Sequence, residues 1–465
     1  MKMQRKLSDY EERLSTLLIG VDSLFGGDVM HESGTKHMIA DSWTSNMVPP
    51  KIYDDETAKL LRDKGGLDGI DNSIINGFIR RYNLIELPEI IREDVLSFQN
   101  KNPDRTTYVH NLVGALEVML RTAIAMSNGT KLPSYEERYL AATAGTLDDV
   151  IVIDTKFERE HLRESLVRDG YEVTNSRNLR ETMKSWHREM GSISSDKLTE
   201  RVGETTSHLL QLTRNKIFSL LDFGISRLNK DLSDVAFDGF KFKTLSGVDF
   251  TGSSIYRGGV DENGKPLLKQ LFEYNTDHPV GKPGLYHLCS HEVVPGHYLQ
   301  SAIGDLLRLN GKLDFESTIG TMCSPETAFR EGWAQNAPSL IFGSRENAVM
   351  ELDKDLRVEL AYDDLQDIGK HNASVLHQRN GLDLDKVKQH IAEDCVQMDP
   401  IVKKLSGSWA KHPIIGPMYG PAYWLGRTIV EKAIEDVGRE KVARIGFMLD
   451  GIVDIGTFKD KAYRG

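Results

Sequence analysis

Apolar residues recur at intervals of three and four along most of the chain, and this spacing restricts the fold more than any other feature. One face of an α-helix presents residues at these intervals, so the pattern predicts packed amphipathic helices. The clearest runs are Leu112, Ala115, Leu116, Met119, Leu120 and Ala123, then Leu299, Ala302, Ile303 and Leu306, and finally Ile429, Ala433, Ile434 and Val437. A mainly α-helical protein is therefore expected.

The pattern changes over residues 236–276, where short β-rich runs replace the helical spacing. The runs lie at Phe240–Thr244, Ser254–Tyr256 and Leu267–Tyr274, and the turn signal Glu262-Asn-Gly264 separates the last two. Such runs beside a turn signal predict a small antiparallel β-sheet. A further β-branched run, Asp149–Asp154, could be either a strand or the edge of a loop.

Composition and charge exclude several classes of protein. The 465 residues are 39% hydrophobic and 27% charged, which is ordinary for a soluble globular chain. The 58 Lys and Arg against 69 Asp and Glu give a formal net charge of −11. We therefore expect no general affinity for nucleic acid or for an anionic membrane surface.

The cysteines and the apolar segments indicate the compartment. Cys289, Cys323 and Cys395 are scattered without C-x-x-C spacing, which argues against a disulfide framework and a thiolate zinc site. Acidic residues precede any apolar run near the N-terminus, so we expect no secretory signal. The most apolar segment, Leu112–Met126, contains two charged residues and is shorter than the roughly 20 residues of a membrane span. These observations predict a cytoplasmic protein in which this segment is a buried helix.

The stretch His291-Glu-Val-Val-Pro-Gly-His297 combines two metal-binding imidazoles with a carboxylate. A Glu next in sequence to a ligand can reach a metal-bound water without coordinating the ion itself. Histidines six residues apart diverge by about 120° on a helix, so a straight helix could not present both to one ion. Pro295 and Gly296 can break the helix and redirect His297.

Other assignments of the ligands remain open. His287 and His291 are four residues apart and could ligate without a break. The histidines could also be unrelated and Glu292 solvated, but the Pro-Gly break would then have no purpose in an apolar helix. Zinc hydrolases usually supply three protein ligands. Glu331, on a second predicted helix, is the best third candidate, and Glu326 is its rival.

Four motifs resemble, in order, those of the domain-of-unknown-function 885 family, whose members are regarded as zinc metallopeptidases. They cover roughly residues 285–430 and are H-E-x-x-P-G-H at 291–297, E-G-W-A at 331–334, D-x-G-x-H at 367–371, and a segment at 417–427 similar to P-G-Q-x-x-x-Y-x-x-G-R/K. The resemblance implies a zincin-like helical metallopeptidase around a Zn²⁺ ion. It implies His291, His297 and Glu331 as ligands and Glu292 as the catalytic carboxylate.

The resemblance also suggests residues beyond the metal set. His371 and Tyr423 are candidate catalytic donors to the oxyanion of a tetrahedral intermediate, with Tyr423 favoured. They could instead be a supporting histidine and a core aromatic residue. Arg427 and Tyr419 are assigned to substrate binding, although Met418 and Tyr419 replace the Gly and Gln of the family's motif.

Together these features predict a zinc-dependent hydrolase of peptide bonds that acts on oligopeptides, with Glu292 as general base. The alternatives are a metal-dependent hydrolase of a non-peptide amide and a non-catalytic protein that binds metal or peptide. An edge strand of the sheet could align an extended peptide. A substrate with a free C-terminus would need a cation, for which Arg427, Lys370 and Arg330 are candidates.

Three regions of one compact body follow from these assignments. Residues 1–235 form a helical N-terminal region, residues 236–345 hold the sheet and the metal-binding helices, and residues 346–465 form a helical region that completes the active site.

Overall fold

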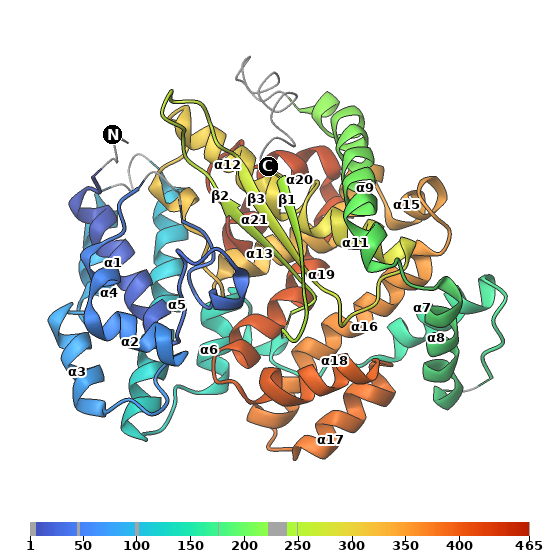
Figure 1. Ribbon diagram of the computed structural model, residues 1–465, viewed down its shortest axis with the longest axis horizontal. Coiled ribbons are helices and arrows are strands. Elements are labelled where there is room, and N and C mark those ends of the chain that lie inside the picture. Colours follow the sequence, from blue (N-terminus) through green and yellow to red (C-terminus); the bar gives the residue numbers. More distant parts are fainter. Residues whose placement is uncertain are drawn as a thin grey trace.

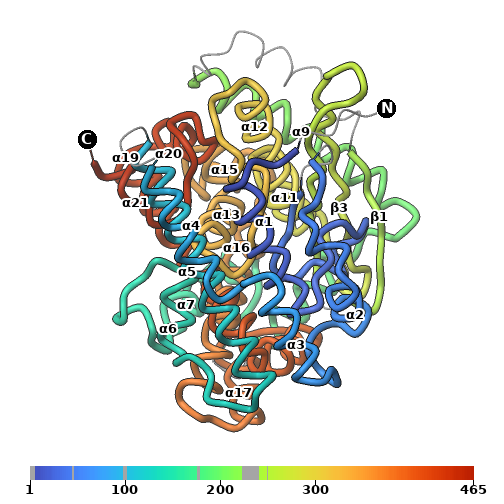
Figure 2. The backbone as a smooth tube through the Cα atoms, turned by 90° about the vertical axis from the view of Figure 1, so that its left-hand side faces the viewer, coloured from blue at the N-terminus to red at the C-terminus, as the bar shows by residue number. Residues whose placement is uncertain are grey.

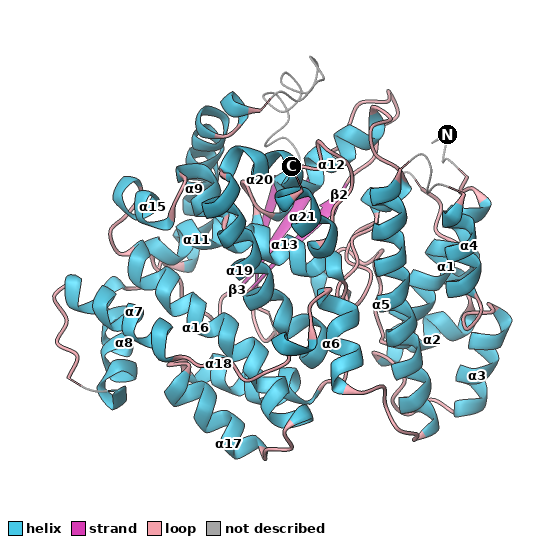
Figure 3. Cartoon of the chain, turned by 180° about the vertical axis from the view of Figure 1, so that it is seen from behind, coloured by secondary structure: helices cyan, strands magenta, loops and turns pink. Residues whose placement is uncertain are grey.

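The computed structural model describes residues 6–43, 47–97, 102–174, 176–221, 240–248 and 250–464. Helices make up most of the molecule, and one small sheet lies among them (Figure 3), which confirms the predicted mainly helical fold. The helices before the sheet are α1 (Asp9–Leu24), α2 (Glu56–Lys64), α3 (Asn72–Arg81), α4 (Leu87–Leu96), α5 (Pro103–Asn128), α6 (Tyr135–Thr143), α7 (Lys156–Arg168), α8 (Ser176–Met190) and α9 (Ser195–Lys216).

A second set of helices follows the sheet and carries the sequence motifs. These are α11 (Lys282–Glu292), α12 (His297–Leu309), α13 (Pro325–Gln335), α14 (Ala337–Phe342), α15 (Arg345–Glu351), α16 (Leu356–Ser374), α17 (Leu384–Gln389), α18 (Asp399–Lys404), α19 (Gly420–Val437), α20 (Arg439–Gly446) and α21 (Ile455–Tyr463). Figures 1 and 2 show the sheet toward one face of the molecule and α5, α6 and α21 toward the opposite face.

The sheet is three-stranded and mixed. The strands β1 (Phe240–Leu245), β2 (Gly252–Arg257) and β3 (Lys269–Asn275) lie in the order β1-β3-β2. β2 is antiparallel to β3, but β1 is parallel to β3, so the expectation of a wholly antiparallel sheet is wrong for β1. Side chains alternate in the same way in both kinds of pairing, and the sequence pattern therefore could not distinguish them.

Segments from distant parts of the chain cover the two faces of the sheet. On one face, the buried carboxylate of Glu273 accepts hydrogen bonds from the Ser33 hydroxyl and the Gly34 backbone N–H, both at 2.9 Å. On the other face, the Gln270 amide donates to the backbone oxygen of Glu292 at 3.0 Å. The sheet thus joins the N-terminal segment to the end of α11.

The remaining expectations concern α5, the β-branched run and the region boundaries. The buried helix expected over residues 112–126 is confirmed as part of α5, which is long and apolar enough to cross a membrane but lies mostly inside the core. Residues 150–154 form an irregular segment rather than a strand. Of the predicted boundaries, 235/236 lies outside the described residues and 345/346 falls within α15, so the three regions stay predictions.

Helices α13 and α19 cross with their backbones in contact. A Cβ atom on Gly332 would lie 2.2 Å from the carbonyl carbon of Gly426, and one on Gly426 would lie 2.0 Å from the backbone oxygen of Ala328. Only glycine allows two helices to approach this closely. These two glycines belong to the E-G-W-A motif and to the segment around Arg427, so part of the motif pattern reflects packing.

Substituting Gly426 by Ala should therefore destabilise the protein by roughly 1–3 kcal/mol, the usual range for overpacking a core. Gly114 is the matched control, because it also lies within a helix but a Cβ there meets nothing within 4 Å. Gly114→Ala should be neutral or stabilise by up to about 1 kcal/mol. Thermal and denaturant unfolding of the two variants would measure the difference, and equal midpoints would contradict the close crossing.

Candidate metal centre

The predicted helix break lies between the two histidines of the 291–297 motif. α11 ends at Glu292 and α12 begins at His297, so the histidines belong to different helices. A Cβ on Gly296 would lie 1.7 Å from the backbone oxygen of His291, which requires glycine at this position. The Gly296 N–H also donates to the backbone oxygen of Ser290 at 3.0 Å. The turn is consequently tight enough to bring His297 back beside His291.

A contact from α13 holds this turn in place. The indole Nε1 of Trp333 donates to the backbone oxygen of Pro295 at 2.9 Å, and the Trp333 side chain is fully buried. Trp333 is two residues after Glu331 on the same helix. The hydrogen bond therefore ties the helix that carries the carboxylate to the turn that separates the histidines.

His291, His297 and Glu331 form one group whose candidate ligand atoms all lie within 4.8 Å of one another. The Glu331 Oε2 atom is 3.4 Å from His291 Nε2 and 3.7 Å from His297 Nε2. Ligand atoms about 2.0–2.1 Å from a tetrahedral ion are separated by roughly 3.3–3.4 Å. The three side chains are only 12%, 13% and 8% exposed. This group therefore fits a divalent cation and could bind one.

The electrostatics of the group also favour a bound positive charge. The two imidazoles hold the pKa of the Glu331 carboxyl well below its usual range, although burial by itself would raise that pKa. Burial would lower the pKa of His291, but Glu331 and Glu292 outweigh it and raise this pKa to about 9. A proton or a metal cation would satisfy this demand.

Two tyrosines from the C-terminal motif support the carboxylate. The Tyr419 hydroxyl donates to Glu331 Oε1 at 3.1 Å, and the hydroxyls of Tyr419 and Tyr423 are 2.7 Å apart. Burial and the nearby Glu331 raise the pKa of both phenols well above 10, so both keep their protons. Since Glu331 can only accept, Tyr423 donates to Tyr419, which donates to Glu331.

Glu292 lies beside this group without belonging to it. Its side chain is buried and lines the same cavity as both histidines and Glu331. A Cβ on Gly252 of β2 would lie 2.9 Å from Glu292 Oε1, so the strand passes directly over the carboxylate. Burial raises the pKa of Glu292, and His291 and His297 oppose the shift only in part. The carboxyl is consequently more basic than an exposed one.

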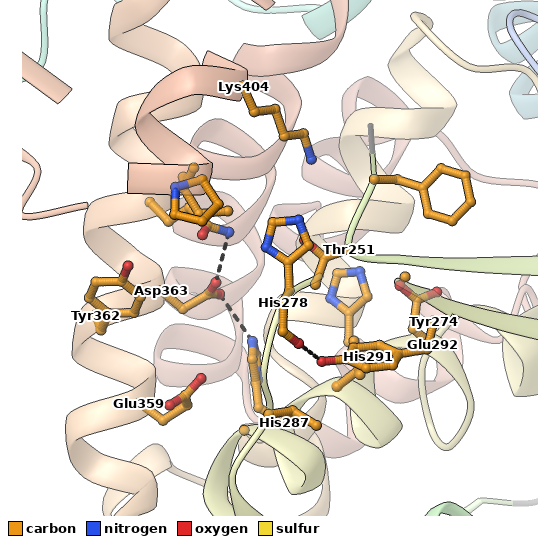
Figure 4. A pocket seen from close by; sticks show the side chains of 18 of the residues that line it. Thr251, Tyr274, His278, His287, His291, Glu292, Glu359, Tyr362, Asp363 and Lys404 are labelled. Carbon is orange, nitrogen blue, oxygen red and sulfur yellow. Dashed lines mark hydrogen bonds and ion pairs between the residues drawn. The ribbon is translucent and has the colours of Figure 1, made fainter. Parts of the chain in front are cut away.

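The cavity in front of these residues has a volume of about 1000 Å³. Its walls come from α8, β2, α11, α16, α18 and the segment around Asp41. Figure 4 shows His291 and Glu292 on one side of it, with His287 and Asp363 facing each other and Lys404 farther along the wall. The space is large enough for several residues of a peptide.

The alternative ligands lie elsewhere. His287 Nε2 is 3.0 Å from Asp363 Oδ2, and among the described residues His287 belongs to no metal-binding group. Glu326 accepts a hydrogen bond from the Thr321 N–H at 3.2 Å and lies near Arg330. Positions 326 and 331 diverge by about 140° on a helix, so only one of them can face the histidines.

Two expected site residues do not reach the cavity. His371 is fully buried, its Nε2 donates to the backbone oxygen of Ile151 at 2.8 Å, and burial lowers its pKa to about 4. Arg427 lies between Asp364 and Glu431, each 3.3 Å away, and is 6% exposed. Neither residue lines the cavity. The catalytic role expected for His371 and the substrate contact expected for Arg427 are therefore wrong, because both side chains point into the packed interior between helices.

Tyr419, Tyr423, Lys370 and Arg330 do line the cavity. Sequence analysis missed other parts of its wall, including Asp41, residues 251–254 of the β2 segment, and the α8 and α18 contributions. Asp41 is joined to the motif region through an isolated bridge between Ala40 and Thr321. No spacing along the chain could reveal this contact, because about 280 residues separate its two sides.

A scan against protein-family models finds no match, and a search of curated proteins finds none. The chain is similar to three solved structures. A protein named as a lipoprotein from Colwellia psychrerythraea shares 13% identity, covering 84% of this chain and 70% of that one, with a TM-score of 0.49. A protein named as a lipoprotein of unknown function from Shewanella oneidensis shares 13%, covering 89% and 74%, with a TM-score of 0.48.

A protein named as oligoendopeptidase F from Bacillus anthracis shares 12% identity, covering 98% of this chain and 72% of that one, with a TM-score of 0.36. Similarities this distant define no function for the chain. Membership of the family that the motifs resemble stays a prediction.

The metal centre is tested by exchanging one buried carboxylate for another on α13. We expect the native protein to bind one divalent ion per chain, and Glu331→Gln to weaken binding by on the order of 100-fold or more, because a ligand is lost. Glu326→Gln should bind like wild type, since Glu326 lies outside the group. Mass spectrometry of metal content, on protein purified without metal-affinity columns, gives the answer. Metal loss in the Glu326 variant alone would show that the wrong carboxylate has been assigned.

Proposed function

We propose that this protein is a zinc-dependent peptidase that hydrolyses oligopeptides. The observation that carries the proposal is the arrangement of Glu292, a buried carboxylate outside the ligand group that lines the same cavity as His291, His297 and Glu331. Two imidazoles and one carboxylate are a ligand set that zinc hydrolases use, with a fourth position open. A zinc ion held there would activate a water molecule and polarise the carbonyl of the scissile bond.

Glu292 would act as the general base and then as the general acid. Its carboxylate would accept a proton from the attacking water and return it to the nitrogen of the leaving amine. The raised pKa of Glu292, caused by burial, suits a group that must both take and release a proton.

Tyr423 is the proposed donor to the oxyanion of the tetrahedral intermediate. Its hydroxyl keeps its proton and lines the cavity, and it would redirect its hydrogen from Tyr419 to the developing charge. The Lys370 Nζ atom lies 3.4 Å from the centre of the Tyr423 ring. This cation limits the movement of the phenol and adds positive charge near the site.

Strand β2 offers a surface for the backbone of an extended substrate. It is an edge strand, with β3 as its one partner in the described part of the chain, and residues 251–254 line the cavity next to Glu292. A peptide paired with such an edge is aligned by main-chain hydrogen bonds, largely independent of its side chains. We therefore propose peptides as substrates and leave the location of the protein inside the cell as a prediction.

Glu292→Gln should lower kcat for oligopeptide cleavage by on the order of 10²–10⁴, the usual contribution of a general base, and should retain the metal. The assay is a peptide library analysed by mass spectrometry, with metal content measured in parallel. Glu359→Gln is the control, because Glu359 is another carboxylate in the cavity wall, whose pKa burial raises to about 7. Turnover at the wild-type rate in Glu292→Gln would rule out the assigned base. Absence of turnover in the wild-type protein would favour a binding function.

Tyr423→Phe should lower kcat by about 10²-fold with little change in KM, because the ring over Lys370 is kept and only the donor is lost. Tyr362→Phe is the matched control. Tyr362 also lines the cavity, but its hydroxyl accepts a hydrogen bond from the Met398 N–H at 3.2 Å. A larger loss in the Tyr362 variant would assign the oxyanion donor to the wrong tyrosine. Steady-state kinetics on one cleaved peptide distinguishes these outcomes.

A further inference from the structure

A buried glutamine lies directly behind His291. Gln335 is the last residue of α13, its side chain is 3% exposed, and its Oε1 atom is 3.1 Å from His291 Nδ1. The opposite ring nitrogen, Nε2, is the one that faces Glu331. Gln335 therefore contacts a candidate ligand from the side away from the metal.

Two carboxylates determine which way the Gln335 amide points. Its Nε2 atom donates to Asp363 Oδ2 at 2.8 Å and to Asp367 Oδ2 at 2.7 Å. An amide nitrogen has two hydrogens, and both are used in these bonds. Rotating the amide by 180° would place its oxygen against two carboxylate oxygens, so the Oε1 atom must face His291.

Neighbouring cations hold both carboxylates in place. Asp363 Oδ2 is 3.0 Å from His287 Nε2, as Figure 4 shows, and Asp367 Oδ1 accepts from Lys370 Nζ at 2.9 Å. The Arg427 guanidinium lies 3.7 Å from Asp367 Oδ2. Each carboxylate is thus oriented independently of Gln335.

We propose that Gln335 is a positioning residue that selects the tautomer of His291. Its carbonyl oxygen can only accept, so the Nδ1 atom of His291 carries the hydrogen and the Nε2 atom presents its lone pair to the ion. Outer partners of this kind typically change metal affinity by about 10–100-fold. The inference rests on the metal centre of the proposed function, but it concerns zinc affinity and not peptide cleavage.

The test is the zinc dissociation constant of the full chain, measured by competition with a chelator of known affinity. Gln335→Met should weaken zinc binding by about 10–100-fold. Gln335→Glu should bind zinc within about fivefold of wild type, because either protonation state keeps an oxygen that accepts from Nδ1. Gln300→Met is the control, since Gln300 is also 3% exposed and donates only to the backbone oxygen of Gly446 among the printed contacts of its side chain. It should leave zinc affinity within about threefold.

Unchanged affinity in Gln335→Met, or equal losses in Gln335→Met and Gln300→Met, would overturn the proposal. If Gln335→Met does not fold, nitrogen-15 spectra of histidine-labelled, zinc-loaded wild-type protein decide, because the proposal requires hydrogen on Nδ1 of His291. Hydrogen on Nε2 would overturn it.

The two proposals fail separately. A wild-type protein that binds zinc, weakens in Gln335→Met and cleaves no peptide would support the role of Gln335 and refute the peptidase. A wild-type protein that binds no zinc would overturn both.

Discussion

The metal centre depends on one steric constraint, the contact between the Gly296 backbone and the backbone oxygen of His291. A turn this tight leaves no room for a Cβ, and it allows two helices to meet end to end with a histidine on each. Without it, His291 and His297 would point about 120° apart and could not share an ion. The same turn leaves Glu292 at the end of α11, buried beside the ligands but outside their group.

The second requirement is that α13 lies close enough to bring Glu331 between the histidines. Its crossing with α19 brings Gly332 and Gly426 into backbone contact, and Trp333 bonds to the turn at Pro295. Three neighbouring residues of one motif thus have three different tasks, which are ligation, close packing and support of the turn. Because α19 also carries Tyr423, and Tyr419 immediately precedes it, the crossing places the hydroxyls that reach Glu331.

Behind the ligands, charged side chains are buried but mutually neutralised. Asp363 and Asp367 face His287, Lys370 and Arg427, while the Gln335 amide bridges the two carboxylates. Isolated charges would be costly in such an interior, whereas paired and hydrogen-bonded ones are tolerated. This pairing explains why Arg427 lies in the interior. A cation among three carboxylates stabilises their burial and is not available to a substrate.

Local features of the sequence determined the helices, the position of the sheet, the break at Pro295 and Gly296, and the chemical types of the metal ligands. Each of these depends on residues within a few positions of one another, where backbone preference and side-chain spacing act directly. Tertiary structure alone decided between His287 and His297, and between Glu326 and Glu331, since those choices depend on which helix face meets another helix. It also decided the direction of β1, the interior positions of His371 and Arg427, and the contribution of Asp41 to the cavity. Such outcomes result from packing between segments far apart in the chain, for which a single sequence contains no local signal.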